Sequence, residues 1–357
     1  MNAIVSVVIP ARGSQDSIRR TIQSLAHQTC LPDEVIVVVG KDDPTRTVIE
    51  DYIDNGFVQI LETDPPARFV RDAHWKRWTG ARIAKGNVIC FTDSNVILEE
   101  HAIQNALDLF KRYNIGAVAG IVPTWPEQSS SFMAKVQDKG LVINYPEFPE
   151  IGFLDKSNFG KSENLPVTGI LLLTKAAFES IQDDFGVEFS SMASTYDDYV
   201  VGWLLVKAGI TIAVTKTVIG YHKPRLSLRK YIKEISRSGQ SAAVMCWQYP
   251  ECPFGKRRLL QTLAVWVITV FGLVVTAISS ALFGPITLLV VTVLAIGGYF
   301  VLGIANAVKI HDFWGFLIPP ITTLLIFTFV VHFTKGWTLV KQKRLEPQNV
   351  QRYLQIR

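Results

Sequence analysis

Fifty consecutive residues without an acidic or basic side chain, from Leu259 to Val308, limit what this 357-residue chain can fold into. A stretch of this kind excludes a purely water-soluble globular protein, a disordered chain and a disulfide-rich scaffold. Three apolar segments run over 259–283, 286–308 and 313–333, and each is long enough to cross about 30 Å of hydrocarbon. We therefore expect two to three transmembrane helices over 259–333.

Basic residues gather on both sides of this apolar region. Residues 223–258 hold nine Lys or Arg against two acids, and the tail 334–357 holds six against one. Positive charge beside membrane segments is typical of the cytoplasmic side and of contact with anionic lipid. We expect residues 226–258 to form a basic amphipathic segment at the membrane interface, and no nucleic acid as a partner.

The number of crossings stays open at this stage. Lys256, Arg257 and Arg258 place the start of the first apolar segment on the cytoplasmic side. A basic cytoplasmic tail over 334–357 then requires an even number of crossings, whereas three segments would put the tail outside. Pro319-Pro320 is compatible with a kinked or re-entrant third segment.

Residues 1–225 alternate between β-branched apolar runs and amphipathic stretches. Strands are expected at 4–9, 35–39, 57–61 and 88–91, with helices between them. This order predicts an α/β domain with a doubly wound, mostly parallel sheet. Residues 123–166, rich in Pro, Ser and Asn, are expected to form an irregular insertion.

Several common functions are excluded by missing motifs. No G-x-G-x-x-G follows the first strand, and no G-x-x-x-x-G-K-[ST] occurs, which argues against nicotinamide cofactors and P-loop nucleotidases. The four cysteines lack metal or redox spacing, so we expect a reduced, cytoplasmic domain. Together with the apolar region, this predicts a multi-pass protein of the inner, cytoplasmic membrane.

Polar residues follow the expected strands, where open α/β folds bind ligands. Asp93 and Asn95 come after the fourth strand and offer oxygen ligands for Mg²⁺ or Mn²⁺. His222 offers a third ligand. Each also has an ordinary interpretation: a strand-end turn for the first pair, and a satisfied structural or membrane-surface histidine for His222.

Two further pairs are candidates for chemistry. Asp197 and Asp198 precede an apolar helix, where carboxylates either cap the helix or act as a general base. Thr168-Gly169 is either a turn into a strand or a place where an acceptor approaches the backbone.

The order of the motifs is more specific than any one of them. The runs that carry it are Val5–Arg12, Ser24–Thr29, Pro32–Val38, Gly80, Gly86–Asp93, Thr168-Gly169, Asp197-Asp198 and Gly209. Together they resemble family 2 glycosyltransferases over about residues 3–240. This resemblance implies a GT-A fold, a nucleotide-sugar donor, a divalent metal (Mn²⁺ or Mg²⁺) and an inverting mechanism.

The resemblance also implies residue roles. Asp93 and Asn95 match the D-x-D metal and diphosphate motif, while Asp198 and Asp197 match the E-D motif, whose aspartate is the base. The strand-one nucleotide contact falls on Ala11 and Arg12, next to Pro10. Asp42 approximates the base-binding aspartate, and Arg77 matches the arginine of the pair before Gly80. An acceptor site is expected at Thr168 and Gly169.

This chain departs from the family pattern in places. Asn95 replaces the second metal aspartate, and Gly40-Lys41 replaces an acidic pair. The Q-x-x-R-W motif of processive synthases is missing after Gln240, so we expect one sugar per acceptor. The predicted function is transfer of one hexose to a lipid-linked saccharide in cell-surface or exopolysaccharide assembly. Transfer to polyprenyl phosphate, or a catalytically silent subunit of an assembly complex, stays open.

Overall fold

The computed structural model describes residues 3–64, 72–139, 149–160, 167–183, 197–311 and 313–341. They fall into two compact units. The first holds 1–128, 145–224 and the chain end from Leu339, and the second holds 129–144 and 225–338. Each unit is described by itself below.

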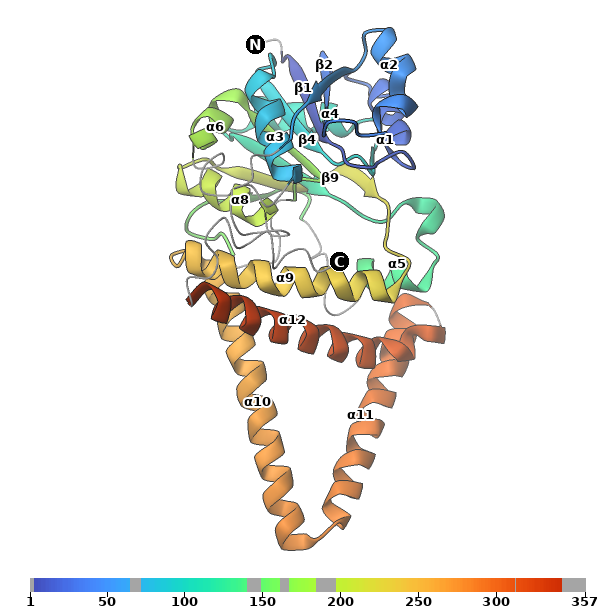
Figure 1. The fold of residues 1–357 in the computed structure, drawn as a ribbon, viewed down its shortest axis with the longest axis vertical. Helices are drawn as coiled ribbons and strands as arrows, with labels where there is room; N and C mark the ends of the chain where they lie inside the picture. Colours follow the sequence, from blue (N-terminus) through green and yellow to red (C-terminus); the bar gives the residue numbers. More distant parts are fainter. Residues whose placement is uncertain are drawn as a thin grey trace. The chain divides into compact units, whose positions relative to one another are not determined.

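Four parallel strands form one half of the sheet in the first unit (Figure 1). In spatial order they are β3 (Gln59–Glu62), β2 (Glu34–Val39), β1 (Val5–Pro10) and β4 (Val88–Thr92). Every residue of β1 and β4 is buried, as expected for apolar β-branched runs covered on both faces. The predicted parallel arrangement is confirmed for these strands.

The other half of the sheet is mixed. Next to β4 lie β8 (Ile170–Thr174), β6 (Ala117–Ile121), β9 (Ile212–His222) and β5 (Val96–Leu98) in that order, and β7 (Gly152–Leu154) pairs with β9. β8 runs antiparallel to both β4 and β6, so the winding reverses at this strand. The three residues of β5 lie directly after the polar loop at Asp93 and pair with the end of β9.

Helices cover both faces of this sheet. They are α1 (Ile18–Ala26), η1 (Arg46–Ile49), α2 (Glu50–Asp54), α3 (Asp72–Ile83), α4 (Ala102–Arg112), η2 (Pro126–Gln128), α6 (Lys175–Glu179) and α8 (Asp197–Lys207). Helix α3 packs on β1 and β2, and α4 packs on β9. The apolar residues of α1 recur at helical spacing, and Ile18, Ile22 and Leu25 are fully buried.

The second unit consists of helices. It contains α5 (Phe132–Lys139), α9 (Leu228–Gln248), α10 (Pro253–Phe283), α11 (Ile286–Ile310), η4 (Phe313–Leu317) and α12 (Ile318–Lys341). An apolar cluster joins α5, α9 and α12; its buried members are Met133, Val136, Tyr231, Ile235, Ile318 and Leu325. The described part of the 123–166 insertion is therefore partly helical, and α5 packs among the helices of the second unit.

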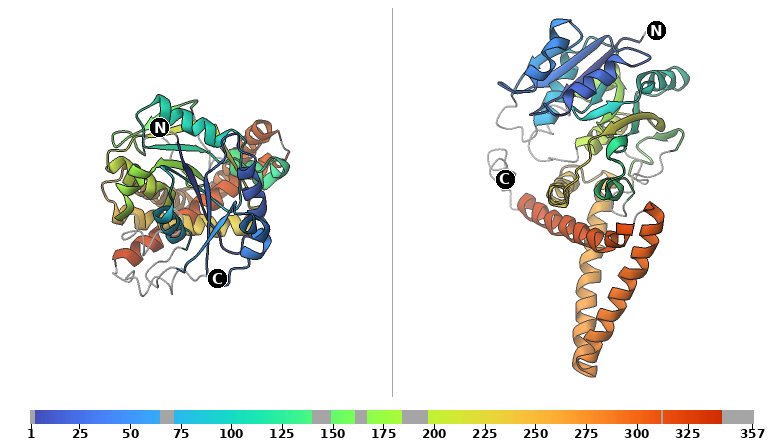
Figure 2. Two further views of the ribbon diagram at one scale, coloured as in Figure 1. Left: turned by 90° about the horizontal axis from the view of Figure 1, so that it is seen from above. Right: turned by 90° about the vertical axis from the view of Figure 1, so that its right-hand side faces the viewer.

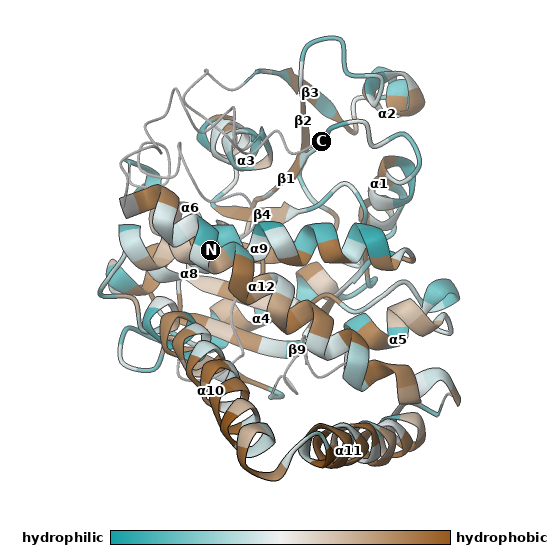
Figure 3. Cartoon of the chain, turned by 60° about the horizontal axis from the view of Figure 1, so that its bottom comes forward, coloured by the Kyte–Doolittle hydropathy of each residue, from teal (hydrophilic) through white to brown (hydrophobic). Residues whose placement is uncertain are grey.

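Three helices are long and apolar enough to cross a membrane: α10, the α11 segment 286–308, and the segment 313–340 that contains η4 and α12. In Figure 3 the colouring of α11 is mostly hydrophobic, and that of α10 is hydrophobic over much of its length. The prediction of an α/β domain followed by helices long and apolar enough to span a membrane is thus confirmed in its architecture. Of the tail 334–357, residues 342–357 lie outside the described residues.

Candidate active site

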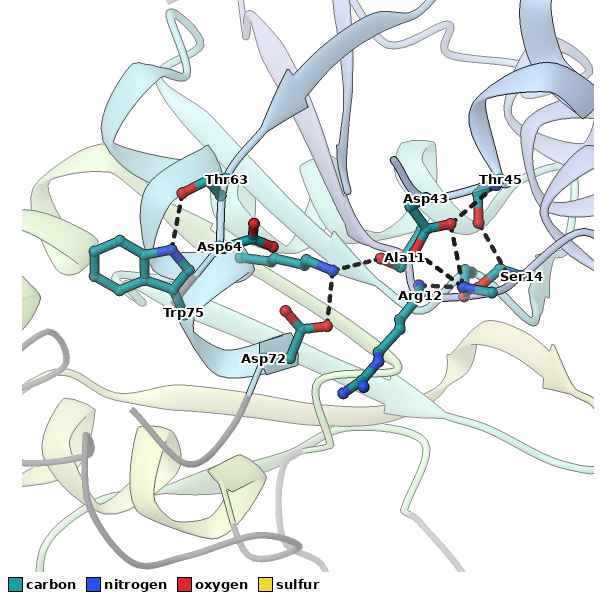
Figure 4. A network of polar contacts seen from close by, with 12 residues as sticks. Ala11, Arg12, Ser14, Asp43, Thr45, Thr63, Asp64, Asp72 and Trp75 are labelled. Atoms are coloured by element: carbon teal, nitrogen blue, oxygen red, sulfur yellow. Dashed lines mark hydrogen bonds and ion pairs between the residues drawn. The ribbon is translucent and has the colours of Figure 1, made fainter. Parts of the chain in front are cut away.

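The loops that follow β1, β2 and β4 meet at one edge of the sheet (Figure 4). The Asp43 carboxylate accepts hydrogen bonds from the backbone N–H of Gly13, at 3.1 Å, and of Thr45, at 2.9 Å. The Ser14 hydroxyl lies 2.7 Å from the hydroxyl of Ser94, which follows Asp93 in the chain. These contacts connect three strand ends into one polar edge, where parallel α/β sheets bind ligands.

The hydrogen bonds of this network stabilise the ionised carboxylate of Asp43. Burial of the carboxylate on its own would raise its pKa, but hydrogen bonds from Thr45 and from the Gly13 amide, with Lys76 nearby, outweigh burial and lower the pKa. Asp42, which was predicted to approximate the base-binding aspartate, is exposed and has a φ of 56°. In this loop Asp43, rather than Asp42, makes the contacts across the sheet edge.

A carboxylate from the next strand end lies beside Gly40. The backbone N–H of Lys41 donates to Asp64 Oδ1 at 3.3 Å, and a Cβ added at Gly40 would lie only 2.9 Å from the same oxygen. There is little room for an acidic side chain at position 40. Asp64, after β3, therefore brings negative charge to the place where the family pattern has its acidic pair.

Lys76 is a buried cation at the same edge. Its side chain is 1% exposed, and its ammonium donates to the Ala11 carbonyl and to Asp72 Oδ2, both at 2.7 Å. The Asp72 side chain is 18% exposed. Lys76 thus joins the start of α3 to the residue that follows β1. The Arg12 guanidinium, by contrast, extends away from the contacts around Asp43 (Figure 4).

Asp93 is held by Arg77. A guanidinium nitrogen of Arg77 contacts Asp93 Oδ1, and the Arg77 side chain is 5% exposed whereas that of Asp93 is 40% exposed. Arg77 sits on α3, one residue after Lys76. The pairing orients a carboxylate that stays open to solvent, as ligation of a cation or a substrate requires.

Two hydrogen bonds link the Asp93 strand end to Asp198. The hydroxyl of Thr92, at the end of β4, donates to the Gly169 carbonyl at 2.9 Å. The neighbouring Thr168 is buried, and its hydroxyl contacts Asp198 Oδ1 in the first turn of α8. The two carboxylates are therefore separated by one turn of chain, Thr168-Gly169. Asp197 is the first residue of α8.

The backbone also brings Asn95 and His222 together. The N–H of Lys223 donates to the Asn95 carbonyl at 3.1 Å, and His222 is the register partner of Val96. With Asp93 two residues before Asn95, the backbone brings three residues close in this corner whose side chains offer a carboxylate, an amide and an imidazole.

Most of the predicted residues thus lie along one sheet edge. Pro10 and Ala11 end β1, where the Ala11 amide donates to the Val38 carbonyl at 2.9 Å. Asp43, Asp64, Asp72 and Lys76 had not been singled out. A charged pair four residues apart in a helix was the available signal for Asp72 and Lys76, whereas Asp43 and Asp64 needed the register of neighbouring strands.

Comparison with known proteins identifies the domain. Residues 6–164 match the model of the family described as Glycosyl transferase family 2. The fold and the polar edge define a GT-A domain of the kind that family contains. This match covers less than half of the chain, and that part is similar to family 2 glycosyltransferases.

One curated protein is similar over a shorter stretch. Over 107 residues the chain is 32% identical to validoxylamine A glucosyltransferase of Streptomyces hygroscopicus subsp. limoneus, covering 29% of this chain and 23% of that protein. The chain thus spans less than a quarter of the length of this curated relative.

A solved structure is similar over nearly the whole chain. The mannosyltransferase PcManGT from Pyrobaculum calidifontis, in complex with GDP-Man and Mn²⁺, matches 96% of this chain and 88% of its own with a TM-score of 0.61 at 13% identity. S. aureus TarS 1–349 in complex with UDP matches 95% of this chain and 92% of its own, with a TM-score of 0.47 at 13% identity.

Proposed function

We propose that the chain is an inverting glycosyltransferase that moves one hexose from a nucleoside-diphosphate sugar to a hydroxyl of a lipid-linked saccharide. The observation that carries the proposal is the hydrogen-bonded connection from Asp93 through Thr92, Gly169 and Thr168 to Asp198. It joins a carboxylate suited to the donor and a carboxylate suited to the acceptor across one turn of chain.

In this proposal Asp198 is the general base. It takes the proton of the acceptor hydroxyl as that oxygen attacks the anomeric carbon, and the bond from this carbon to the diphosphate breaks on the opposite face. The Thr168 hydroxyl keeps Asp198 oriented. A Cβ at the neighbouring Gly169 would lie 3.2 Å from Val122, and the acceptor would approach the Thr168-Gly169 backbone. Asp197 is proposed as the other acid of the same pair.

The donor is proposed to lie along the strand ends. Pro10, Ala11 and Arg12 would contact the nucleotide, with Asp42 beside the base and Arg77 orienting Asp93 at the diphosphate. Asp93, Asn95 and His222 would hold a divalent cation, which supplies charge neutralisation for the leaving diphosphate. Support comes from GDP-Man and Mn²⁺ in the Pyrobaculum mannosyltransferase and from the family match.

We place the protein in the inner membrane, with residues 1–225 in the cytoplasm and the acceptor at an anionic membrane surface. Three apolar helices and the basic flanks of α10 support this location. Synthesis of a cell-surface or extracellular polysaccharide is the corresponding process.

A nucleotide-sugar screen tests the donor half of the proposal. The purified protein is heated with GDP- and UDP-sugars, with Mn²⁺ and with EDTA. Because a ligand that binds the folded state stabilises it, we expect at least one nucleotide sugar to raise the Tm with Mn²⁺ and to lose this effect with EDTA. No stabilisation by any of them would contradict the proposal.

Acceptor assays test the other half. Transfer to a lipid-diphosphate saccharide is the expected result. Transfer to polyprenyl phosphate alone would instead assign the second reaction, in which a phosphate oxygen is the nucleophile. Absence of both transfer and donor hydrolysis would identify a catalytically silent subunit.

A further inference from the structure

The third apolar helix differs from the other two in its surroundings. Only 6% of the most apolar window is buried in α10 and in α11, whereas 33% is buried in the segment that contains α12. Length and composition alone would let all three cross a membrane. The contacts of α12 indicate a different arrangement.

α12 bridges α10 and α11 instead of running along them. Trp266 Nε1 of α10 donates to Thr334 Oγ1 of α12 at 2.9 Å, and Tyr299 of α11 lies 2.9 Å from Thr323 Oγ1 by their hydroxyl oxygens. The two partners on α12 are eleven residues apart, about 16 Å along a helix. One helix thus spans the gap between the other two, as the views in Figures 1 and 2 show.

The first contact lies toward the charged end of α10, and the second lies near the middle of α11. Trp266 comes eight residues after Arg258, and Tyr299 comes ten residues before Lys309, or about 12 and 15 Å along their helices. If α12 instead crossed antiparallel to α11, Thr334 would lie about 24 Å from the start of α12, roughly two thirds of the way to the turn at Gly284. It would then no longer be level with Trp266.

The remaining face of α12 packs on α9. A Cβ at Gly239 of α9 would overlap the backbone oxygen of Phe329, so the two helices approach backbone to backbone. Exposed basic residues lie on the other side of α9; they are Arg229, Lys230, Lys233 and Arg237. Phe313 and Trp314, which precede α12, are 75% and 54% exposed, as is typical of aromatic residues at a membrane interface.

We propose that α10 and α11 alone cross the bilayer, and that α12 lies with α9 in the leaflet at their charged ends as a platform for anionic lipid. Two crossings return the chain to its starting side, so the basic tail 334–357 lies on the same side as Lys256–Arg258. Two crossings keep the basic stretches 223–258 and 334–357 on one side of the membrane, whereas three would separate them. Their combined positive charge favours anionic lipid as the ligand of this platform. The inference concerns the membrane region and holds whether or not the transfer reaction is assigned correctly.

Labelling from each side of the membrane tests the topology. One accessible cysteine is introduced per variant of the full chain: Phe283→Cys at the α10–α11 turn, Arg357→Cys at the end or Glu50→Cys in the first unit. Each variant also carries Cys30→Ser, and the remaining Cys90, Cys246 and Cys252 are buried. A membrane-impermeant maleimide is applied to intact cells and to inverted vesicles. We expect Arg357→Cys and Glu50→Cys to react from one side and Phe283→Cys from the other.

Two results overturn the proposal. Reaction of Arg357→Cys from the same side as Phe283→Cys would establish a third crossing, and reaction of all three from one side would establish none. A C-terminal epitope tag on the otherwise unaltered chain, tested for protease access in inverted vesicles, decides the tail side even where a cysteine variant fails to fold.

Crosslinking tests the position of α12 directly. Thr334→Cys combined with Trp266→Cys is expected to form an oxidative crosslink, whereas Thr334→Cys combined with Ile278→Cys, nearer the turn, is the matched control and is expected to form none. The reverse pattern would place α12 across the bilayer and contradict the proposal.

Discussion

Replacing Lys76 by Met tests how the buried polar edge of the sheet is held together. Met keeps the apolar stem and removes the ammonium, so the Ala11 carbonyl and Asp72 lose their 2.7 Å hydrogen bonds. A hydrogen bond to a charged group contributes about 1.5–3 kcal/mol, and removing one partner of a buried ion pair costs about 3–5 kcal/mol. Because the Asp72 side chain is 18% exposed and water can reach it, we expect a loss of about 2–4 kcal/mol.

The assay is thermal unfolding of the purified protein in detergent. For a domain of this size, 1 kcal/mol corresponds to roughly 2–4 °C, so Lys76→Met should lower the Tm by about 5–15 °C. Lys85→Met, at an exposed lysine close to the end of the same helix, is the control and should lie within about 0.5 kcal/mol of the parent protein. A Tm for Lys76→Met equal to that of the control would refute the reasoning, because desolvation of the ammonium would then cancel its hydrogen bonds.

Three further substitutions give separate predictions. The pKa of Asp43 is lowered in the folded state, so its stabilising contribution is present above the unfolded pKa of about 3.9 and is lost as the pH falls through the folded value. The Tm difference between Asp43→Asn and the parent protein should therefore shrink between pH 5 and pH 3. A constant or growing Tm difference would contradict this prediction. Arg77→Met removes the guanidinium that contacts Asp93 and should weaken metal-dependent donor binding about tenfold or more, as measured by calorimetry. An unchanged affinity would show that Arg77 does not position Asp93 for binding. Gly239→Leu should disrupt the approach of α9 to α12 and lower the Tm, whereas Gly272→Leu, where a Cβ meets nothing, should leave it nearly unchanged; equal effects would argue against the close approach.

Local sequence patterns predicted the buried strands and the amphipathic helix α1. The β-branched runs of β1, β2 and β4 are buried strands, and the helical spacing of Ile18, Ile22 and Leu25 places α1 on the core. Three-residue strands such as β5 carry no such signal, because their pairing with β9 depends on residues more than a hundred positions away.

The residues of the site that belong to a sequence motif could be predicted. The contacts between residues of different strands could not. Asp93 and Asp198 follow from the order of the motifs. The Thr92–Gly169 hydrogen bond that helps to connect them depends on the pairing of β4 with β8, and the Thr168–Asp198 hydrogen bond depends on the position of α8. The same holds for Asp64 beside Gly40. Apolar length likewise predicted two to three membrane helices, whereas the packing of α12 on α9 depends on tertiary contacts.

The most direct measurement compares donor binding and turnover in Asp198→Asn. The amide keeps the size of the side chain and an oxygen for Thr168, but it cannot take a proton from an acceptor hydroxyl. Metal-dependent binding of the nucleotide sugar should stay within about twofold, while transfer should fall by roughly 100-fold or more, or at least about 2.7 kcal/mol of transition-state stabilisation. Full turnover in Asp198→Asn would contradict the assignment of the base, and with it the proposed mechanism.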